Sequence, residues 1–184
     1  MDNVYEELIE KLKLSGIKFD EGLNDIEISE IEKIYGIIFP NELKLFYKKA
    51  LPVSKGFYDW KDRSDSNVNY IKRVISLPVD SAIEDVEEIE WSENWGKKPN
   101  DVVEIKEAVQ RMALDAPKLI PIYSHRYTPS GYGDDAPVLS IHGTDIIYYA
   151  ENIYEYFCVE FKIKDYKVLK NNEAKYVPFW SDLM

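Results

Sequence analysis

The sequence predicts a single α+β domain in which a mixed, largely antiparallel sheet packs with several helices. Segments with helical spacing fill the first two thirds of the chain, and short β-branched and aromatic runs follow them. No linker, internal repeat or low-complexity segment divides the 184 residues. Helices that precede clustered strands are typical of α+β rather than alternating α/β proteins. This length also suits one domain with a core that needs no disulfide.

Three helices are predicted before Pro52, because apolar residues recur there every three or four positions. Asn24 or Asp25 can cap the second helix, and Gly36 can adopt the left-handed conformation that ends it. Pro40 suits the first turn of the third helix. The residues that carry these patterns are Val4, Leu8, Leu12, Ile28, Ile31, Tyr35, Leu43, Phe46 and Tyr47.

Two more helices are predicted in the middle of the chain. The first begins at Asp65 or Ser66 and is expected to end at Pro78, because proline lacks the backbone N–H that a helix interior uses. The second is capped by Asn100 or Asp101 and ends before the next proline.

Short runs of β-branched and aromatic residues then predict strands at 119–123, 137–141 and 145–149. The last two are separated by few enough residues to form a hairpin. Near the C-terminus, 166–169 is a possible further strand, and 177–180 is an apolar anchor.

Asn152 can cap a last helix, which contains the only cysteine, Cys158. A single cysteine cannot form an internal disulfide. Cys158 has apolar neighbours and no adjacent His or Arg, so a buried, inert thiol is favoured over a nucleophile.

The charge excludes some classes of partner. The chain has 34 acidic and 23 basic side chains, a formal charge of −11. Nucleic acids and anionic membrane surfaces are therefore disfavoured, because both are bound mainly through Lys and Arg. A basic protein would be attracted, although such a charge also serves solubility.

The acidic N-terminus has no signal-peptide pattern and no apolar run approaches the roughly 20 residues of a membrane span, so a cytoplasmic protein is expected.

Known catalytic and cofactor motifs are absent from the sequence. It has no phosphate-binding loop, dinucleotide fingerprint, Cys-x-x-Cys pair or Gly-x-Ser-x-Gly elbow. The only two histidines, His125 and His142, belong to no recognised metal-ligand spacing. We therefore expect no enzymatic activity, no metal and no cofactor.

One polar cluster could form either a pocket or a structural contact. His125, Arg126 and Tyr127 follow a predicted strand, so an imidazole, a guanidinium and a phenol meet near one end of the sheet. Arg126 is expected to pair with a carboxylate if it is buried. A structural ion pair is favoured over a pocket floor. The nearby acidic candidates are Asp134, Asp135 and Asp145.

The chain is rich in aromatic residues, with 14 Tyr, four Trp and seven Phe. Trp60 is expected in the core, whereas Trp91 and Trp95 lie in an acidic stretch. Tyr and Trp dominate the energetics of many protein interfaces. The acidic stretch 80–90 is compatible with a solvated helix face, or with a surface for a partner. The candidate partner-binding residues are Trp91, Trp95, Glu87, Glu88, Glu90 and Glu93.

Short motifs occur along most of the chain in a characteristic order. They begin with Ile31-Glu32, Tyr35-Gly36-Ile37 and Phe39-Pro40 around the second and third helices. Later motifs are Leu51-Pro52-Val53, Gly56-Phe57-Tyr58-Asp59-Trp60, Trp95-Gly96-Lys97-Lys98-Pro99, Leu119-Ile120-Pro121-Ile122-Tyr123-Ser124-His125-Arg126-Tyr127 and Thr144-Asp145-Ile146-Ile147-Tyr148-Tyr149.

This ordered set, which runs from about residue 28 to 161, resembles a bacterial branch of the SUKH superfamily, which includes the yeast regulator of cell-wall assembly and glucan synthesis. The resemblance implies an α+β domain without enzymatic activity. It also implies an immunity protein that binds and neutralises a toxin of a polymorphic toxin system, often a nuclease, as in toxin–antitoxin pairs. Many members have Asn-Gly-Gly after the third helix, where this chain reads Lys48-Lys49-Ala50-Leu51-Pro52, so the class of toxin is not implied.

The leading hypothesis is therefore a non-catalytic protein-binding module of the immunity type, with a protein partner for which a basic toxin domain is the candidate. One alternative is a regulatory interaction scaffold without a toxin partner. The other is a small-ligand or metal-dependent enzyme centred on His125 and its neighbours. The strands between 119 and 149 could also leave an unpaired edge for dimerisation, so the oligomeric state stays open.

Overall fold

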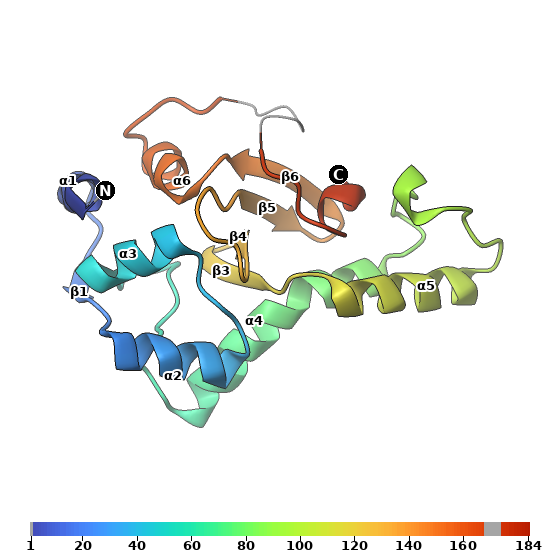
Figure 1. Cartoon of the computed structure of the whole chain (residues 1–184), viewed down its shortest axis with the longest axis horizontal. Helices are drawn as coiled ribbons and strands as arrows, with labels where there is room; N and C mark the ends of the chain where they lie inside the picture. Colours follow the sequence, from blue (N-terminus) through green and yellow to red (C-terminus); the bar gives the residue numbers. More distant parts are fainter. Residues whose placement is uncertain (1, 168–173) are drawn as a thin grey trace.

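The computed structural model describes residues 2–167 and 174–184 and shows an α+β domain (Figure 1). The predicted fold class is confirmed, and the strands of both sheets pair antiparallel. The elements are α1 (Asp2–Leu14), β1 (Phe19–Glu21), α2 (Asp25–Tyr35), α3 (Asn41–Lys49), β2 (Ala50–Pro52), α4 (Asp65–Glu84), η1 (Glu93–Trp95), α5 (Val102–Asp115), β3 (Leu119–Tyr123), β4 (Arg126–Pro129), β5 (Val138–His142), β6 (Asp145–Ala150), α6 (Ile153–Glu160) and η2 (Ser181–Leu183).

The predicted helix caps are confirmed where local sequence determines them. The side chain of Asn24 accepts hydrogen bonds from the first turn of α2, and the Glu27 carboxylate accepts one from the Asn24 backbone. Gly36 ends α2 with a φ of 60°, a conformation that costs glycine little. Asp101 and Asn152 cap α5 and α6 in the same manner.

The prediction that Pro78 ends its helix is wrong. Helix α4 continues through this proline to Glu84. A proline inside a helix loses one backbone hydrogen bond and costs about 3 kcal/mol. Apolar residues on both sides of Pro78 are buried, among them Ile71, Val74 and Ala82. Their burial, at about 1.5–3 kcal/mol for each large side chain, outweighs the loss. The predicted helical stretch 80–90 therefore belongs to α4 only as far as Glu84.

The larger sheet has the strand order β3-β4-β5-β6, and each strand pairs with its neighbour in sequence. Residues 126–129, which form strand β4, are not among the predicted strands. A two-residue turn at Ser124 and His125 instead folds them back onto β3. In Figure 1, α4 passes below β3 and α6 packs beside β6, so helices cover the sheet.

The C-terminal segment completes the core. Val177, Phe179 and Trp180 are buried, which confirms the predicted apolar anchor, and the indole of Trp180 donates to the Pro117 carbonyl at 2.8 Å. Trp60 and Cys158 are buried, as predicted. In the possible strand 166–169, the first two residues form no strand, and residues 168–169 lie outside the described residues. Among the described helices, none is long and apolar enough to cross a membrane.

Candidate functional site

The segment Glu84–Trp95, hereafter the acidic–aromatic segment, joins the end of α4 to the short helix η1. Its six carboxylates are all exposed, and none forms an ion pair with another residue in the part of the chain that the structure describes. These carboxylates belong to Glu84, Asp85, Glu87, Glu88, Glu90 and Glu93.

The position of the first carboxylates works against helix stability. The C-terminal end of a helix carries partial negative charge, so an acidic residue there is unfavourable by about 0.3–1 kcal/mol. Helix α4 ends at Glu84, Asp85 is its C-cap, and its last turn contains no basic residue. The segment thus concentrates negative charge where the fold itself gains nothing from it.

Trp91 and Trp95 form a pair within this segment. Their ring centroids lie 5.2 Å apart with the planes at 85°, an edge-to-face contact. Trp95 also stacks on Phe179, at 5.8 Å and 15°, so the pair rests on the C-terminal anchor. The indole N–H of Trp91 donates to the Gly96 carbonyl at 2.9 Å. Both tryptophans remain partly exposed, so the pair presents aromatic surface beside the carboxylates.

The carboxylate of Asp182 holds this arrangement in place. It accepts hydrogen bonds from the Asn94 amide at 2.7 Å and the Tyr176 hydroxyl at 2.8 Å. The Ser92 hydroxyl and the Trp95 indole donate to it at 3.3 Å. Burial alone would raise the pKa of Asp182, but these four donors outweigh burial and lower it. The sequence reasoning missed Asp182, because its partners Ser92, Asn94 and Trp95 lie almost 90 residues away.

The second candidate cluster is divided by the fold. Arg126 pairs with Glu160 of α6, with Nε and Oε2 3.1 Å apart, and donates to the Ser140 hydroxyl at 2.8 Å. Its guanidinium also lies over the Tyr149 ring, 4.0 Å from the centroid. The carboxylate partner is therefore Glu160. It is none of the three predicted partners, Asp134, Asp135 and Asp145.

Asp134 and Asp135 lie toward the opposite end of β4 from His125. The Asp134 carboxylate accepts from the Asn41 amide at 3.3 Å, and the Asn41 backbone N–H donates to the Gly133 carbonyl at 3.2 Å. Both interactions place the loop at the start of α3. The structure therefore does not bring Asp134 or Asp135 beside His125.

The two histidines do come together. The rings of His125 and His142 lie 6.2 Å apart, perpendicular to one another. Among the described residues, no group of three or more His, Cys, Asp or Glu side chains could hold a metal ion. Burial raises the pKa of the Cys158 thiol, which leaves it in the weakly nucleophilic neutral form.

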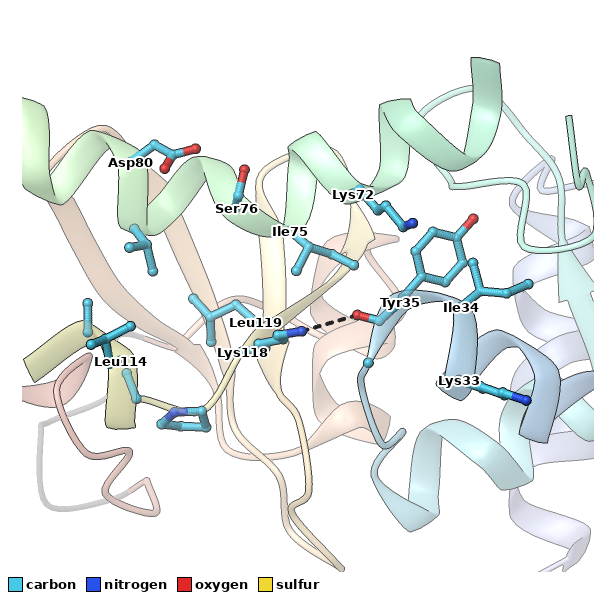
Figure 2. Close-up of a pocket in the computed structure, with 15 residues that line it drawn as sticks. Lys33, Ile34, Tyr35, Lys72, Ile75, Ser76, Asp80, Leu114, Lys118 and Leu119 are labelled. Atoms are coloured by element: carbon cyan, nitrogen blue, oxygen red, sulfur yellow. Dashed lines mark hydrogen bonds between the residues drawn. The ribbon is translucent and has the colours of Figure 1, made fainter. Parts of the chain in front are cut away.

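A cavity of about 730 Å³ lies between α2, α4 and the end of α5 (Figure 2). Its wall is apolar, with Ile75 and Leu119 at its base and Leu114 84% exposed. Three lysines surround it, and Lys118 donates to the Tyr35 carbonyl at 3.3 Å. Because the described residues that line this surface include three lysines but only one acidic residue, Asp80, the surface is unsuited to a basic partner.

Comparison of the chain with protein-family models, with curated proteins and with solved structures found no match in any of the three.

Proposed function

We propose that this protein is a non-catalytic protein-binding module of the immunity type, which neutralises a basic toxin domain by covering it. The observation that carries the proposal is the acidic–aromatic segment. There, exposed carboxylates that form no ion pair with any described residue lie beside a partly exposed tryptophan pair. Hydrogen bonds to Asp182 hold this segment in position.

The chemistry of the partner follows from this surface. A domain that cleaves nucleic acid must carry cationic side chains to hold phosphate. A cluster of carboxylates attracts such a domain over long range and accelerates association. Tryptophan side chains then supply apolar area at the centre of the contact, where binding energy is concentrated. The resemblance to the SUKH superfamily supports a toxin as the partner, but it does not imply the class of that toxin.

In this proposal, inhibition needs no bond-making step by the immunity protein. The carboxylates of residues 84–93 occupy the cationic groups that the toxin uses for its own substrate. Competition for those groups removes toxin activity for as long as the complex lasts. Fixing Trp91 and Trp95 before binding limits the conformational entropy lost on association.

The experiment uses the protein encoded beside this gene as the partner. Co-expression should restore growth that this partner alone arrests, and surface plasmon resonance should detect a complex. The triple variant Glu87→Gln, Glu88→Gln, Glu90→Gln should lower the association rate constant about tenfold or more.

The matched control removes three exposed carboxylates elsewhere, by Asp20→Asn, Glu21→Gln and Asp115→Asn. It changes the net charge equally, so its association rate should fall much less. Equal losses in the two triple variants would show that total charge, and not this segment, attracts the partner. Loss of binding in Leu114→Ser alone would place the partner on the lysine-rimmed cavity instead.

A further inference from the structure

The topology of the four-stranded sheet brings the only two histidines of the chain to one place. The β3–β4 turn contains His125, and β5 ends at His142 just before the β5–β6 turn. In an antiparallel sheet of this order, both turns lie at the same end. Ser124, at the first turn, has a φ of 50°, which is uncommon for a residue other than glycine. Its hydroxyl lies 3.3 Å from Nδ1 of His125.

A cleft of about 610 Å³ separates these two turns from helix α4. This volume lies within the range of small-molecule sites, about 300–1,000 Å³. The Tyr58 and Tyr70 rings stack in it, with centroids 6.2 Å apart and planes at 27°. Val74, Leu77 and Ile141 supply apolar surface. The polar side chains that line the cleft are Tyr58, Tyr70, Arg73, Ser124, His125, Tyr127 and His142.

The cleft contains hydrogen-bond donors without acidic partners. None of the described residues that line it is Asp or Glu, although the chain has 34 of them. Arg73 forms no ion pair or side-chain hydrogen bond with another described residue. Glu160, which acts on His125 from α6, is already paired with Arg126. The Arg73 guanidinium is therefore available to a ligand, whereas the Tyr58 hydroxyl already donates to the Ser124 carbonyl at 2.6 Å.

We propose that this cleft binds a small aryl phosphate, in which one phosphate group is attached to an aromatic ring. Arg73, His125 and His142 hold the anion: the guanidinium matches its charge, and the imidazole N–H groups donate to its acceptor oxygens. The ring lies against Tyr58 and Tyr70. The site lies apart from the acidic–aromatic segment, so it would give the protein a ligand in addition to its protein partner.

The protonation of His125 couples binding to pH. Burial, Arg126 and His142 lower its pKa, while Glu160 of α6 acts in the opposite direction. Arg73 on α4 adds positive charge from the other wall, and Asp145 is the register partner of His142 on β6. His125 is therefore neutral near pH 7 in the free protein. A bound anion favours the imidazolium, so binding takes up a proton and strengthens as the pH falls.

The test uses phenyl phosphate, inorganic phosphate and phenol as probes of the intact chain at pH 7.5. Proton NMR follows the Cε1–H resonances of the two histidines, which no other residue obscures. Phenyl phosphate should shift both resonances saturably and bind at least tenfold more tightly than inorganic phosphate or phenol. Absence of a saturable shift at millimolar phenyl phosphate would overturn the proposal, and so would equal affinity for phenol.

Two variants localise the site. Arg73→Gln should weaken phenyl phosphate binding at least tenfold, whereas Arg111→Gln, an exposed arginine on α5, should leave it unchanged. A circular dichroism spectrum and a spread of proton NMR chemical shifts that match those of the unmodified protein confirm that each variant is folded. Equal effects of the two variants would contradict the assignment.

The pH dependence of binding is measured with benzenesulfonate, because the charge of this anion stays constant between pH 5.5 and 7.5. Its affinity should rise up to about tenfold over that interval as the pH falls, and His125→Gln should reduce this rise. Affinity that is independent of pH in the unmodified protein would overturn the role given to the histidines. Loss of toxin binding does not bear on these measurements, so this proposal and the proposed function can fail separately.

Discussion

At the scale of single residues, Asp182 joins two segments that lie far apart in the sequence. Its carboxylate connects the η1 loop to the C-terminal turn through three donors, and Tyr176 of the C-terminal segment supplies a fourth. We predict that Asp182→Ala lowers the free energy of unfolding by about 1–3 kcal/mol, because four hydrogen bonds to a charged acceptor are lost. The tryptophan emission should move to longer wavelength as Trp95 becomes more hydrated. Asp115→Ala, an exposed control, should change neither quantity.

The same carboxylate gives the loop a defined response to acid. Its pKa is lowered in the folded chain, so it stabilises the fold above the ordinary Asp value, near 3.9, and this contribution is lost as the pH falls through the lowered pKa. We predict that the tryptophan emission of the unmodified protein stays constant from pH 7 to about pH 4.5 and changes only below about pH 4. A change of emission near pH 6 would show that a group other than Asp182 controls the response of the loop to acid.

At the scale of the elements, the pair Arg126–Glu160 connects β4 to α6. Both side chains are mostly buried, 13% and 16% exposed. Glu160→Gln leaves a buried guanidinium without its counter-charge, and we predict a loss of about 2–3 kcal/mol of unfolding free energy in urea titrations. The double variant Arg126→Met, Glu160→Met should lose less than the single one. Glu107→Gln, which breaks an exposed ion pair with Arg111, should cost at most about 0.5 kcal/mol.

Helix α4 offers a test of whether its acidic end serves binding rather than stability. We predict that Glu84→Lys raises the free energy of unfolding by about 0.3–1 kcal/mol, because a cation suits the C-terminal end of a helix. The same substitution should slow association with a basic partner. Asp65→Lys, at the opposite end of α4, should destabilise the protein instead. If Glu84→Lys destabilises it as well, the carboxylate has a structural role.

The elements also show how far sequence reasoning reaches. Caps such as Asn24 and Asp101 were predictable, because their bonds span three residues or fewer. The partner of Arg126 was not, because Glu160 is 34 residues away and the fold chooses among many carboxylates. The continuation of α4 through Pro78 was not predictable from local sequence. The lost backbone hydrogen bond is a local cost, whereas the burial that offsets it depends on contacts with distant segments. Asp182 and the histidine cleft likewise depend on contacts between distant segments.

At the scale of the whole molecule, charge is distributed unevenly. The acidic–aromatic segment has exposed carboxylates that pair with none of residues 2–167 and 174–184, whereas the cleft at the turns and the cavity beside Lys72 present basic groups. The net charge of −11 therefore does not describe every surface of the protein. A basic macromolecule and a small anion can be accommodated on different faces without competing for the same side chains.

The central claim is that the molecule acts by charge-guided contact with a protein. It is tested most directly by measuring the association rate constant with the neighbouring gene product at increasing salt. Because the Debye length shortens from about 14 Å to about 4 Å between roughly 0.05 and 0.5 M salt, we predict at least a tenfold fall in the association rate, with little change in dissociation. An association rate that does not depend on salt, or no complex at the lowest salt, would contradict this account.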